Sequence, residues 1–380
     1  MLIGIDASRA LRPQRTGTER YALEIIQHLL ALPAARQHQW RLYVDQQPAL
    51  DHLLAAAHLP THATLTLLPR RRMWTHRALA AEVLAHPPNV LFVPSHLLPL
   101  VLPHHRLPPA VVTIHDLGYY HFPAAHPWQQ RLYVDWGTRW SAWAATRVLA
   151  ISHATATDLQ GIIKTPAEKI AVVHEGASNL PIPNAAAMAA VGARYALPAA
   201  YMLYVGTLQP RKNLARLITA YEQLCARGDA EFDLVLAGNA GWLSEAIVAQ
   251  ARQSPHAARI HLLGYVPDVD LAALLAGARA FLYPSLYEGF GLPILEAQSL
   301  GVAVMSGKGS SLPEVAGDAA LYVDPTDIEA IAQAMLRLSQ DEALRQELIA
   351  AGQRNVQRFS WEKAAAETLA VLETAAAQGR

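Results

Sequence analysis

The sequence predicts an α/β protein made of two doubly wound parallel-sheet domains that face each other across a cleft. Three observations support this prediction: the chain length, its short apolar runs, and the amphipathic segments between those runs. The chain has 380 residues, and because a domain takes about 150 residues, two domains are expected. Hydrophobic residues make up 52% of the chain, which is enough for two cores.

Short, continuously apolar runs recur along the chain and suit strands that are buried on both faces of a parallel sheet. In the first half they are LIGIDA (2–7), RLYV (41–44), VLFV (90–93), AVVTI (110–114), RVLAI (147–151) and IAVV (170–173). In the second half they are YMLYVG (201–206), DLVLAG (233–238), RIHLLG (259–264), RAFLYP (279–284), VAVM (302–305) and ALYV (320–323).

Helical patterns lie between these runs. One apolar face recurs at helical spacing over about 18–32, and another over 328–338, where Thr326 and Glu329 have capping-box spacing. Strands that alternate with helices predict right-handed βαβ units and a parallel sheet.

The pattern occurs twice and is interrupted over 178–200, a stretch with three prolines and little amphipathic character. We place a hinge there, between domains at 1–185 and 195–358. Ligands bind such sheets at the carboxyl ends of the strands, so the cleft between the domains is the expected active site.

Composition excludes several classes of protein. Lys plus Arg and Asp plus Glu both number 31, and this zero net charge argues against a dedicated nucleic-acid binder. The single cysteine, Cys225, excludes an internal disulfide framework and favours a reducing compartment. The first residues, MLIGIDAS, have no basic region typical of a signal peptide. A cytoplasmic protein is expected. Arg70, Arg71 and Arg72 are expected in a solvated turn anchored by Trp74, and contact of these residues with an anionic membrane is the alternative.

The richest segment is FLYPSLYEGFGLPILEAQSLG, residues 281–301. A strand is expected to end at Pro284 and a helix to begin near Leu292, with two glycines between them. A helix N-terminus behind glycines offers free backbone N–H groups to a phosphate. Glu288 and Glu296 are poor phosphate ligands but good acceptors for sugar hydroxyls. The alternative is an ordinary strand–loop–helix joint with a surface glutamate.

A second segment, YVGTLQPRKNLARLITAY, covers residues 204–221. Its strand is expected to end at Gly206, and Arg211 and Lys212 follow before a helix. Two cations at the end of a strand can neutralise a diphosphate, and each charge-assisted hydrogen bond contributes about 1.5–3 kcal/mol. The alternative is a pair of solvated loop cations.

Another strand end, in the first half of the chain, carries polar residues. His115 and Asp116 end the strand at 110–114 and are expected to point into the cleft, although a buried histidine without catalytic work is the alternative. Neither these residues nor His121 and His126 have the spacing of a zinc site, so no metal is expected.

The first strand–helix joint carries Gly17 and Thr18 before a helix, with Arg9, Arg12 and Arg15 in the loop. The joint does not match a dinucleotide-binding glycine motif. It is either a loop that contacts an acceptor or a phosphate, or a solvated loop.

The DVD sequence at 268–270 is similar to a metal-binding motif, but Asp268 after Pro267 is better explained as a helix cap, with Asp270 in the first turn.

Together, these segments resemble a retaining glycosyltransferase of the two-Rossmann GT-B architecture, in family 4 (group 1), with mannosyltransferase-like character. The resemblance covers nearly the whole chain and is strongest over 201–325. It is carried by YEGFGLPILEA, which resembles the two-glutamate signature, and by GTLQPRKN, which resembles the phosphate-binding loop. GTERY and TIHDL resemble segments of the N-terminal domain in mannosyltransferase-like members. Thr207 departs from the pattern, because many members carry a cation there.

The resemblance implies roles for individual residues. Lys212 and Arg211 would stabilise the departing diphosphate, Glu288 would hold donor-sugar hydroxyls, Glu296 would bind the donor ribose, and His115 would contact the donor sugar. The other residues implied in donor binding are Gly17, Gly206, Tyr265, Val266, Phe290, Gly291 and Leu292.

The resemblance also implies a reaction. A hexose, with mannose favoured, would move from GDP-mannose to a glycan or lipid-linked acceptor in polysaccharide biosynthesis, with retention and without a metal. The enzyme would act in the cytoplasm, with the inner face of the membrane as an alternative, and would bind no nucleic acid. Segment 360–375 would cross back to the first domain. Competing hypotheses are a nucleotide-sugar epimerase of the same fold, which lacks the glutamate pair, and a non-catalytic homologue that binds nucleotide or glycan.

Overall fold

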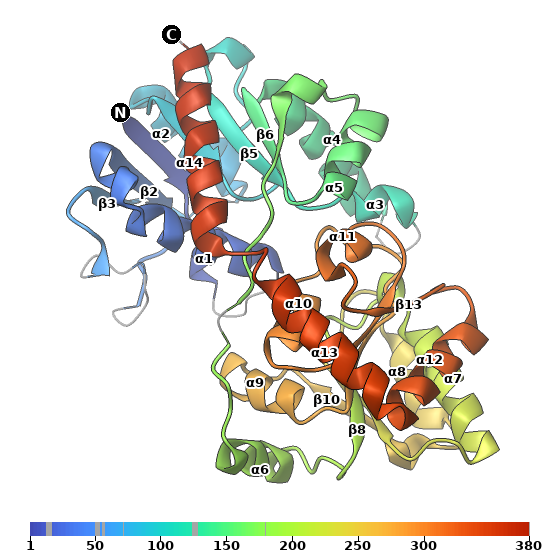
Figure 1. Ribbon diagram of the computed structural model, residues 1–380. Helices are drawn as coiled ribbons and strands as arrows, with labels where there is room; N and C mark the ends of the chain where they lie inside the picture. Colours follow the sequence, from blue (N-terminus) through green and yellow to red (C-terminus); the bar gives the residue numbers. More distant parts are fainter. Residues whose placement is uncertain are drawn as a thin grey trace. The chain divides into compact units, whose positions relative to one another are not determined.

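The computed structural model describes residues 1–12, 17–49, 54, 58–70, 72–123, 128–178 and 180–379 (Figure 1). Arg15, Arg71 and His126, which entered the sequence-based hypotheses, lie outside the described residues.

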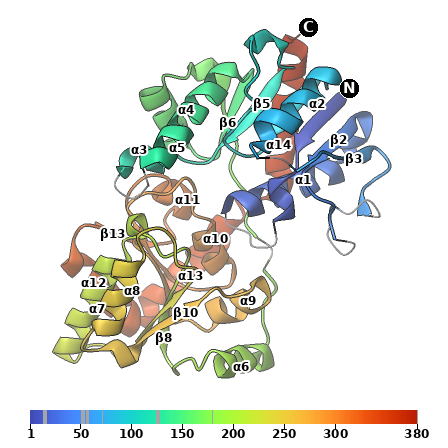
Figure 2. The same ribbon diagram turned by 180° about the vertical axis from the view of Figure 1, so that it is seen from behind.

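The chain forms two compact units. Unit 1 comprises Met1–Tyr120, Trp128–Gly176 and Phe359–Arg380, and unit 2 comprises His121–Pro127 and Ala177–Arg358. Residues 177–185, which we had placed in the first domain, therefore group with unit 2. Both units contain a parallel sheet with helices on its two faces (Figures 1 and 2), which confirms the doubly wound α/β fold class.

Unit 1 has seven parallel strands in the order β3-β2-β1-β4-β5-β6-β7. The helices α1 and α14 pack together on one face of the sheet, and α2 and α4 lie on the other (Figures 1 and 2). The strands are β1 (Leu2–Asp6), β2 (Gln39–Val44), β3 (Ala63–Leu67), β4 (Val90–Val93), β5 (Ala110–Ile114), β6 (Arg147–Ala150) and β7 (Ile170–Val172). The α-helices are α1 (Gly17–Ala31), α2 (Ala80–Ala85), α3 (Gly118–His121, whose last residue groups with unit 2), α4 (Trp128–Ala144), α5 (His153–Asp158) and α14 (Trp361–Gln378).

Unit 2 has six parallel strands in the order β10-β9-β8-β11-β12-β13. The helix α7 packs against α12, and α10 packs against α13. The strands are β8 (Tyr201–Val205), β9 (Asp233–Ala237), β10 (Ile260–Gly264), β11 (Ala280–Tyr283), β12 (Val304–Gly307) and β13 (Leu321–Val323). The helices are α6 (Ala185–Arg194), α7 (Leu214–Arg227), α8 (Glu245–Gln253), α9 (Asp268–Ala276), α10 (Leu292–Ser299), α11 (Leu312–Ala316), α12 (Ile328–Gln340) and α13 (Glu342–Val356).

All twelve apolar runs form strands, and most boundaries agree within two residues. The sequence missed β3, whose residues ATLTL are mostly part-exposed at one edge of the sheet. An edge strand of this kind has no continuous apolar run, so the criterion for buried strands fails there.

Two helix starts differ from the expected ones. The N-cap of α12 is Asp327, whose side chain accepts a hydrogen bond from the Ala330 N–H; the capping box that we assigned to Thr326 is wrong. The capping role of Asp268 is also wrong, because Asp268 is already helical and makes no side-chain cap. The carbonyl of Pro267 accepts the first hydrogen bonds of α9 instead.

Candidate active site

The sheet of unit 2 has a topological switch point between β8 and β11. These strands are neighbours, and the chain proceeds from β8 towards one edge of the sheet and from β11 towards the other. Ligands of doubly wound sheets bind beyond the carboxyl ends of strands at such a point. The loop after β8 contains Arg211 and Lys212, and the loop after β11 contains Glu288.

Glycines end the three strands on one side of this switch point. Gly206, Gly238 and Gly264 follow or end β8, β9 and β10, with φ values of +150°, +143° and +70°. A Cβ on Gly238 would lie 2.0 Å from the carbonyl oxygen of Gly206. Only glycine therefore allows the backbone after β9 to pass so close to the backbone after β8.

The loop after β8 is tied to the loop after β11 by backbone and amide hydrogen bonds. Asn213 has φ +64°, and its amide nitrogen donates to the carbonyl oxygens of Pro284, at 3.1 Å, and Pro325, at 2.5 Å. The Leu286 N–H donates to the carbonyl oxygen of Arg211 at 2.9 Å. These bonds hold the short 3₁₀ turn Pro210–Lys212 at the switch point.

The central feature of the site is a buried ion cluster. Lys212 Nζ donates to Glu288 Oε1 at 2.5 Å, and Arg211 Nη1 donates to Glu288 Oε2 at 2.9 Å. Lys212 Nζ also donates to the Tyr283 hydroxyl at 3.1 Å. Lys212 and Glu288 are only 7% and 6% exposed. The residues singled out separately as loop cations and a loop carboxylate are thus in direct contact.

The protonation states in this cluster follow from burial and charge. Burial raises the pKa of Glu288, but the charges of Lys212 and Arg211 outweigh burial and lower the pKa to about 2. Glu288 is therefore ionised near neutral pH. Burial raises the pKa of Tyr204 and of Tyr283 well above the ordinary value, so both phenols are neutral. A neutral Tyr283 serves as an acceptor for Lys212.

The loop from Glu288 to α10 is held by two serines. The Glu288 N–H donates to Ser310 Oγ at 2.8 Å, and Ser311 Oγ donates to the carbonyl oxygens of Glu288 and Phe290 at 2.9 and 2.6 Å. Gly291 has φ +129° and occupies the N-cap position of α10. The helix begins at Leu292, as the sequence predicted, and its N-terminus directly follows the ion cluster in the chain.

Glu296 lies one turn into α10 and is 3% exposed. Ser178 Oγ donates to Glu296 Oε1 at 3.1 Å. Tyr265 and Val266 follow β10, which is separated from β8 by β9; Tyr265 is 43% exposed and Val266 is buried. The ends of β8, β10 and β11, which precede Lys212, Tyr265 and Glu288, thus lie along the same edge of one sheet.

His115 follows β5 in unit 1 and is buried. Its Nε2 is 3.0 Å from the carbonyl oxygen of Pro94, and its Nδ1 is 3.8 Å from Glu175 Oε1. The rings of Tyr21 and His96 lie 4.8 and 5.5 Å from the His115 ring, centre to centre. Burial and the neighbouring His115 lower the pKa of His96 to about 4, so His96 is neutral at neutral pH.

The first strand–helix joint of unit 1 places its described arginines in ion pairs. Arg9 Nη1 lies 3.2 Å from Glu19 Oε1, and Arg12 Nη2 lies 2.7 Å from Asp45 Oδ2. Gly17 is the first residue of α1 and is exposed. The ring of Tyr21, four residues after Gly17 in α1, lies beside that of His115.

The second carboxylate of the DVD sequence, Asp270, contributes to the packing of α6. Asp270 Oδ1 accepts from Arg194 Nη1 at 2.5 Å, and Asp270 Oδ2 accepts from the Tyr195 hydroxyl at 2.9 Å. The hydrogen bond from Arg194 is the main cause of a lowered pKa of Asp270. Asp270 therefore holds the end of α6 against α9.

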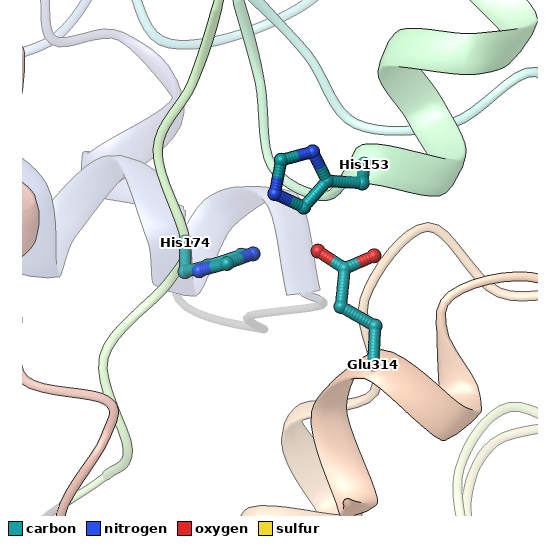
Figure 3. Close-up of side chains that lie close together, drawn as sticks. All are labelled: His153, His174 and Glu314. Atoms are coloured by element: carbon teal, nitrogen blue, oxygen red, sulfur yellow. The ribbon is translucent and has the colours of Figure 1, made fainter.

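Several residues of these sites were not singled out in the sequence. They include Asn213, Tyr283, Ser310 and Ser311 around the ion cluster. A pair of histidines in unit 1, His153 and His174, was not singled out either. His153 opens α5 and His174 follows β7, with ring centres 5.7 Å apart (Figure 3); Glu314, also drawn, belongs to α11 of unit 2. A serine pair before a short helix, GSSLPEV, was the available signal for Ser310 and Ser311.

Two family models match the chain. Residues 196–355 match the model of the glycosyl transferases group 1, and residues 15–178 match that of glycosyltransferase family 4. A relative from Escherichia coli, O-antigen chain mannosyltransferase B, is 33% identical and covers 96% of this chain and 98% of its own. The MMP alpha-(1->4)-mannosyltransferase of Mycolicibacterium hassiacum is 34% identical over 44% of this chain and 41% of its own.

Solved structures of low sequence identity share the fold. A sucrose-phosphate synthase from Thermosynechococcus elongatus matches with a TM-score of 0.77 at 20% identity, over 99% of both chains. HepE from Anabaena, solved with UDP and glucose, matches with a TM-score of 0.73 at 18% identity, over 98% of this chain and 99% of its own.

Two doubly wound domains of this kind and the matching families define a glycosyltransferase of GT-B architecture. The chain belongs to glycosyltransferase family 4, group 1. No helix in the described ranges is both long and apolar enough to cross a membrane.

Proposed function

We propose that the protein transfers mannose from GDP-mannose to a glycan or lipid-linked acceptor, with retention of the anomeric configuration and without a metal ion. The observation that carries the transfer from a nucleotide sugar is the contact of Lys212 and Arg211 with Glu288 at the switch point of unit 2, shortly before the N-terminus of α10.

The cations and the helix terminus are suited to a diphosphate leaving group. When the bond between the anomeric carbon and the phosphate oxygen breaks, negative charge develops on the diphosphate. Fixed cations and backbone N–H groups that are already in place stabilise this charge without reorganisation. Lys212, Arg211 and the backbone of Phe290, Gly291 and Leu292 would do so, and for this reason a metal is not required in the proposed reaction.

The carboxylates are suited to the donor's hydroxyl groups. An ionised Glu288, fixed by two cations, can accept hydrogen bonds from sugar hydroxyls and thereby orient the anomeric carbon. Glu296, farther along α10, would accept from the ribose. His115 would contact the donor sugar, Gly17 would lie near the reacting centre, and Gly206, Tyr265 and Val266 would border the nucleotide.

The identity of the sugar rests on the relatives. Two of them are mannosyltransferases by name, and one of these spans nearly the whole chain, which supports mannose. The choice of GDP follows from mannose as the sugar. The ion cluster itself does not distinguish nucleobases, since Lys212 and Arg211 would contact the diphosphate.

A thermal-shift panel tests the donor. The protein is incubated with GDP-, UDP-, ADP- and dTDP-sugars in buffer that contains a chelator, and we expect GDP-mannose to raise the Tm. Stabilisation by UDP-sugars and none by GDP-sugars would overturn the mannose assignment. The same panel with Lys212→Ala should show a smaller shift, because the diphosphate loses a cation. The anomeric configuration of the product, measured by NMR, tests retention.

A further inference from the structure

The helix α4 (Trp128–Ala144) presents its large side chains to solvent. Five of them are exposed: Trp128 by 65%, Leu132 by 56%, Tyr133 by 44%, Trp136 by 46% and Trp143 by 57%. We call these five residues the α4 aromatic face. The buried residues of the same helix are small or polar, namely Gly137, Thr138, Ser141 and Ala142.

An ordinary surface helix turns its apolar stripe towards the core; in α4, Val134 packs against the core, but five large side chains are exposed. The spacing of Trp128, Leu132 and Trp136 places them on successive turns of one side, and Trp143 continues that side. A contiguous exposed patch of large apolar side chains marks an interaction surface. The core of unit 1 does not account for these side chains, because they point away from it.

The segments that border the face are basic. The rings of Trp143 and His104 are in contact at a tilt, with their centres 4.3 Å apart, which places the exposed segment Leu102–Arg106 beside Trp143. Tyr133 accepts a hydrogen bond from His76 at 3.1 Å, which places Arg72–Arg77 at its other side. Within these two segments and α4, the arginines are Arg72, Arg77, Arg106, Arg131 and Arg139, and the acidic residue is Asp135.

The one acidic residue is already neutralised, because both carboxylate oxygens of Asp135 accept from Arg139 Nε, at 3.2 and 3.0 Å. The surface thus combines tryptophan and tyrosine rings with an excess of arginines. Such rings are enriched where a protein meets the headgroup region of a bilayer, and each basic residue near an anionic leaflet adds attraction.

We propose that the α4 aromatic face docks unit 1 onto a bilayer that contains anionic phospholipid. A neutral glycan would also stack on exposed aromatic rings, but it gains nothing from the surrounding arginines. A protein interface also uses aromatic rings and arginines, but its core is depleted in charge overall, whereas five arginines and a single acidic residue lie on this helix and in its two bordering segments. An anionic bilayer matches both the aromatic and the basic part of the surface. The proposal is independent of the sugar and the donor, since it concerns a surface built from α4 and its neighbours.

The site differs from the one that the sequence suggested. The segment at 69–84 was the candidate for membrane contact through Trp74, but Trp74 is only 9% exposed. Met73, beside it, is 53% exposed, and the exposed aromatic rings lie on α4 instead. Residues of 69–84 contribute cations at the border.

Vesicle flotation tests the proposal with the full chain. Vesicles of phosphatidylcholine alone are compared with vesicles that also contain phosphatidylglycerol. We expect binding to the anionic vesicles, weaker binding at high salt, and a loss of at least about tenfold in the double variant Leu132→Gln/Trp136→Gln, since both side chains leave water on binding. Trp242→Gln, an exposed tryptophan of unit 2, is the matched control and should bind like the wild type.

A second variant tests the contribution of the arginines to vesicle binding. Arg106→Gln/Arg131→Gln should bind anionic vesicles more weakly and show a shallower salt dependence. The proposal is overturned if the wild type does not float with anionic vesicles, or if the Leu132/Trp136 variant floats as the wild type does. Binding of mannan by the wild type, lost in the same variant and without vesicle binding, would assign the face to a glycan instead.

Discussion

Lys212 Nζ and Glu288 Oε1 lie 2.5 Å apart, although 76 residues separate them in the chain. Their bond joins the loop after β8 to the loop after β11, so an ion pair connects the two loops at the switch point. Because both side chains are buried, the loss of either partner leaves a charge with weaker compensation. The pair therefore links the stability of unit 2 to the proposed chemistry.

Lys212→Ala should lower the transfer rate by about 10²–10³, the loss seen when one donor to a developing anion is removed. The free energy of unfolding should fall by about 3 kcal/mol, so the variant should still fold. Initial rates and circular-dichroism melts measure the two effects. Arg227→Ala is the control, because Arg227 pairs with Glu329 at the surface. Unchanged turnover in Lys212→Ala would remove Lys212 from the mechanism.

Glu288→Gln should also lower transfer by about 10²-fold, because a neutral amide does not compensate Lys212. The pKa of Glu288 is lowered to about 2 from 4.5. Its stabilising contribution is therefore present above about pH 4.5 and is lost as the pH falls towards about 2. The Tm of the wild type should fall over this range, and that of the variant should fall less. Parallel pH profiles would contradict an ionised Glu288.

Unit 1 should lose stability in mild acid through His96. Its pKa is lowered to about 4, whereas an unfolded histidine titrates near 6.5. Stability is complete above about pH 6.5 and falls as the pH drops towards about 4, because the unfolded chain binds the proton first. Between pH 8 and pH 5 the loss is on the order of 1–2 kcal/mol. Chemical unfolding of the wild type and of His96→Asn at both pH values measures it, and an equal loss in both would exclude His96.

Gly176→Ala should disturb the docking of α14. A Cβ on Gly176 would lie 2.3 Å from the backbone nitrogen of Trp361, and the backbone of α14 has to shift to avoid it. We expect a loss of about 1–3 kcal/mol, the order found for overpacked cores. Gly161→Ala is the matched control, because nothing lies within 4 Å of its added Cβ. Equal Tm values for the two variants would show that the site relaxes at no cost.

Arg194→Ala should release α6 locally. Arg194 is largely exposed and bonds Asp270 through its guanidinium, so the global Tm should change little. Amide exchange in residues 185–194 should accelerate, because α6 has few buried side chains of its own. Exchange in α12 serves as the internal reference, because α9 itself carries the partner Asp270. Unaltered exchange in α6 would show that its packing does not depend on the pair.

Most of the fold could be predicted from the sequence because parallel strands buried on both faces leave continuous apolar runs. Val90–Val93 and Ala110–Ile114 were predicted with their observed bounds. The edge strand Ala63–Leu67 could not be found, since two threonines interrupt its apolar residues and only Ala63 is buried. The start of α12 was misplaced by one residue because Thr326 and Asp327 are both capping residues, and only the backbone decides between them.

The candidate site was predicted as separate pieces. Arg211, Lys212 and Glu288 were named from their loops, but their mutual contact depends on the strand order, which places β11 beside β8. Tyr283 was not predicted as a site residue because it belongs to an apolar strand. Asn213 was not predicted because the two cations before it, Arg211 and Lys212, were the evident charged groups of the loop. Their roles arise from hydrogen bonds between segments about 70 residues or more apart, which no local pattern encodes.

The place of α14 in unit 1 has a consequence for the order of events during synthesis. Its residues follow Gly176 by more than 180 positions, and at about 5–20 residues per second the ribosome needs on the order of 10–40 s to produce them. Until α14 has been synthesised, the sheet face that it covers, which includes β4 and β5, stays exposed. Unit 2 contains most of its sequence in one stretch and can be completed before unit 1. The exposed apolar face of the nascent N-terminal sheet is therefore the part of the chain to which a chaperone would bind.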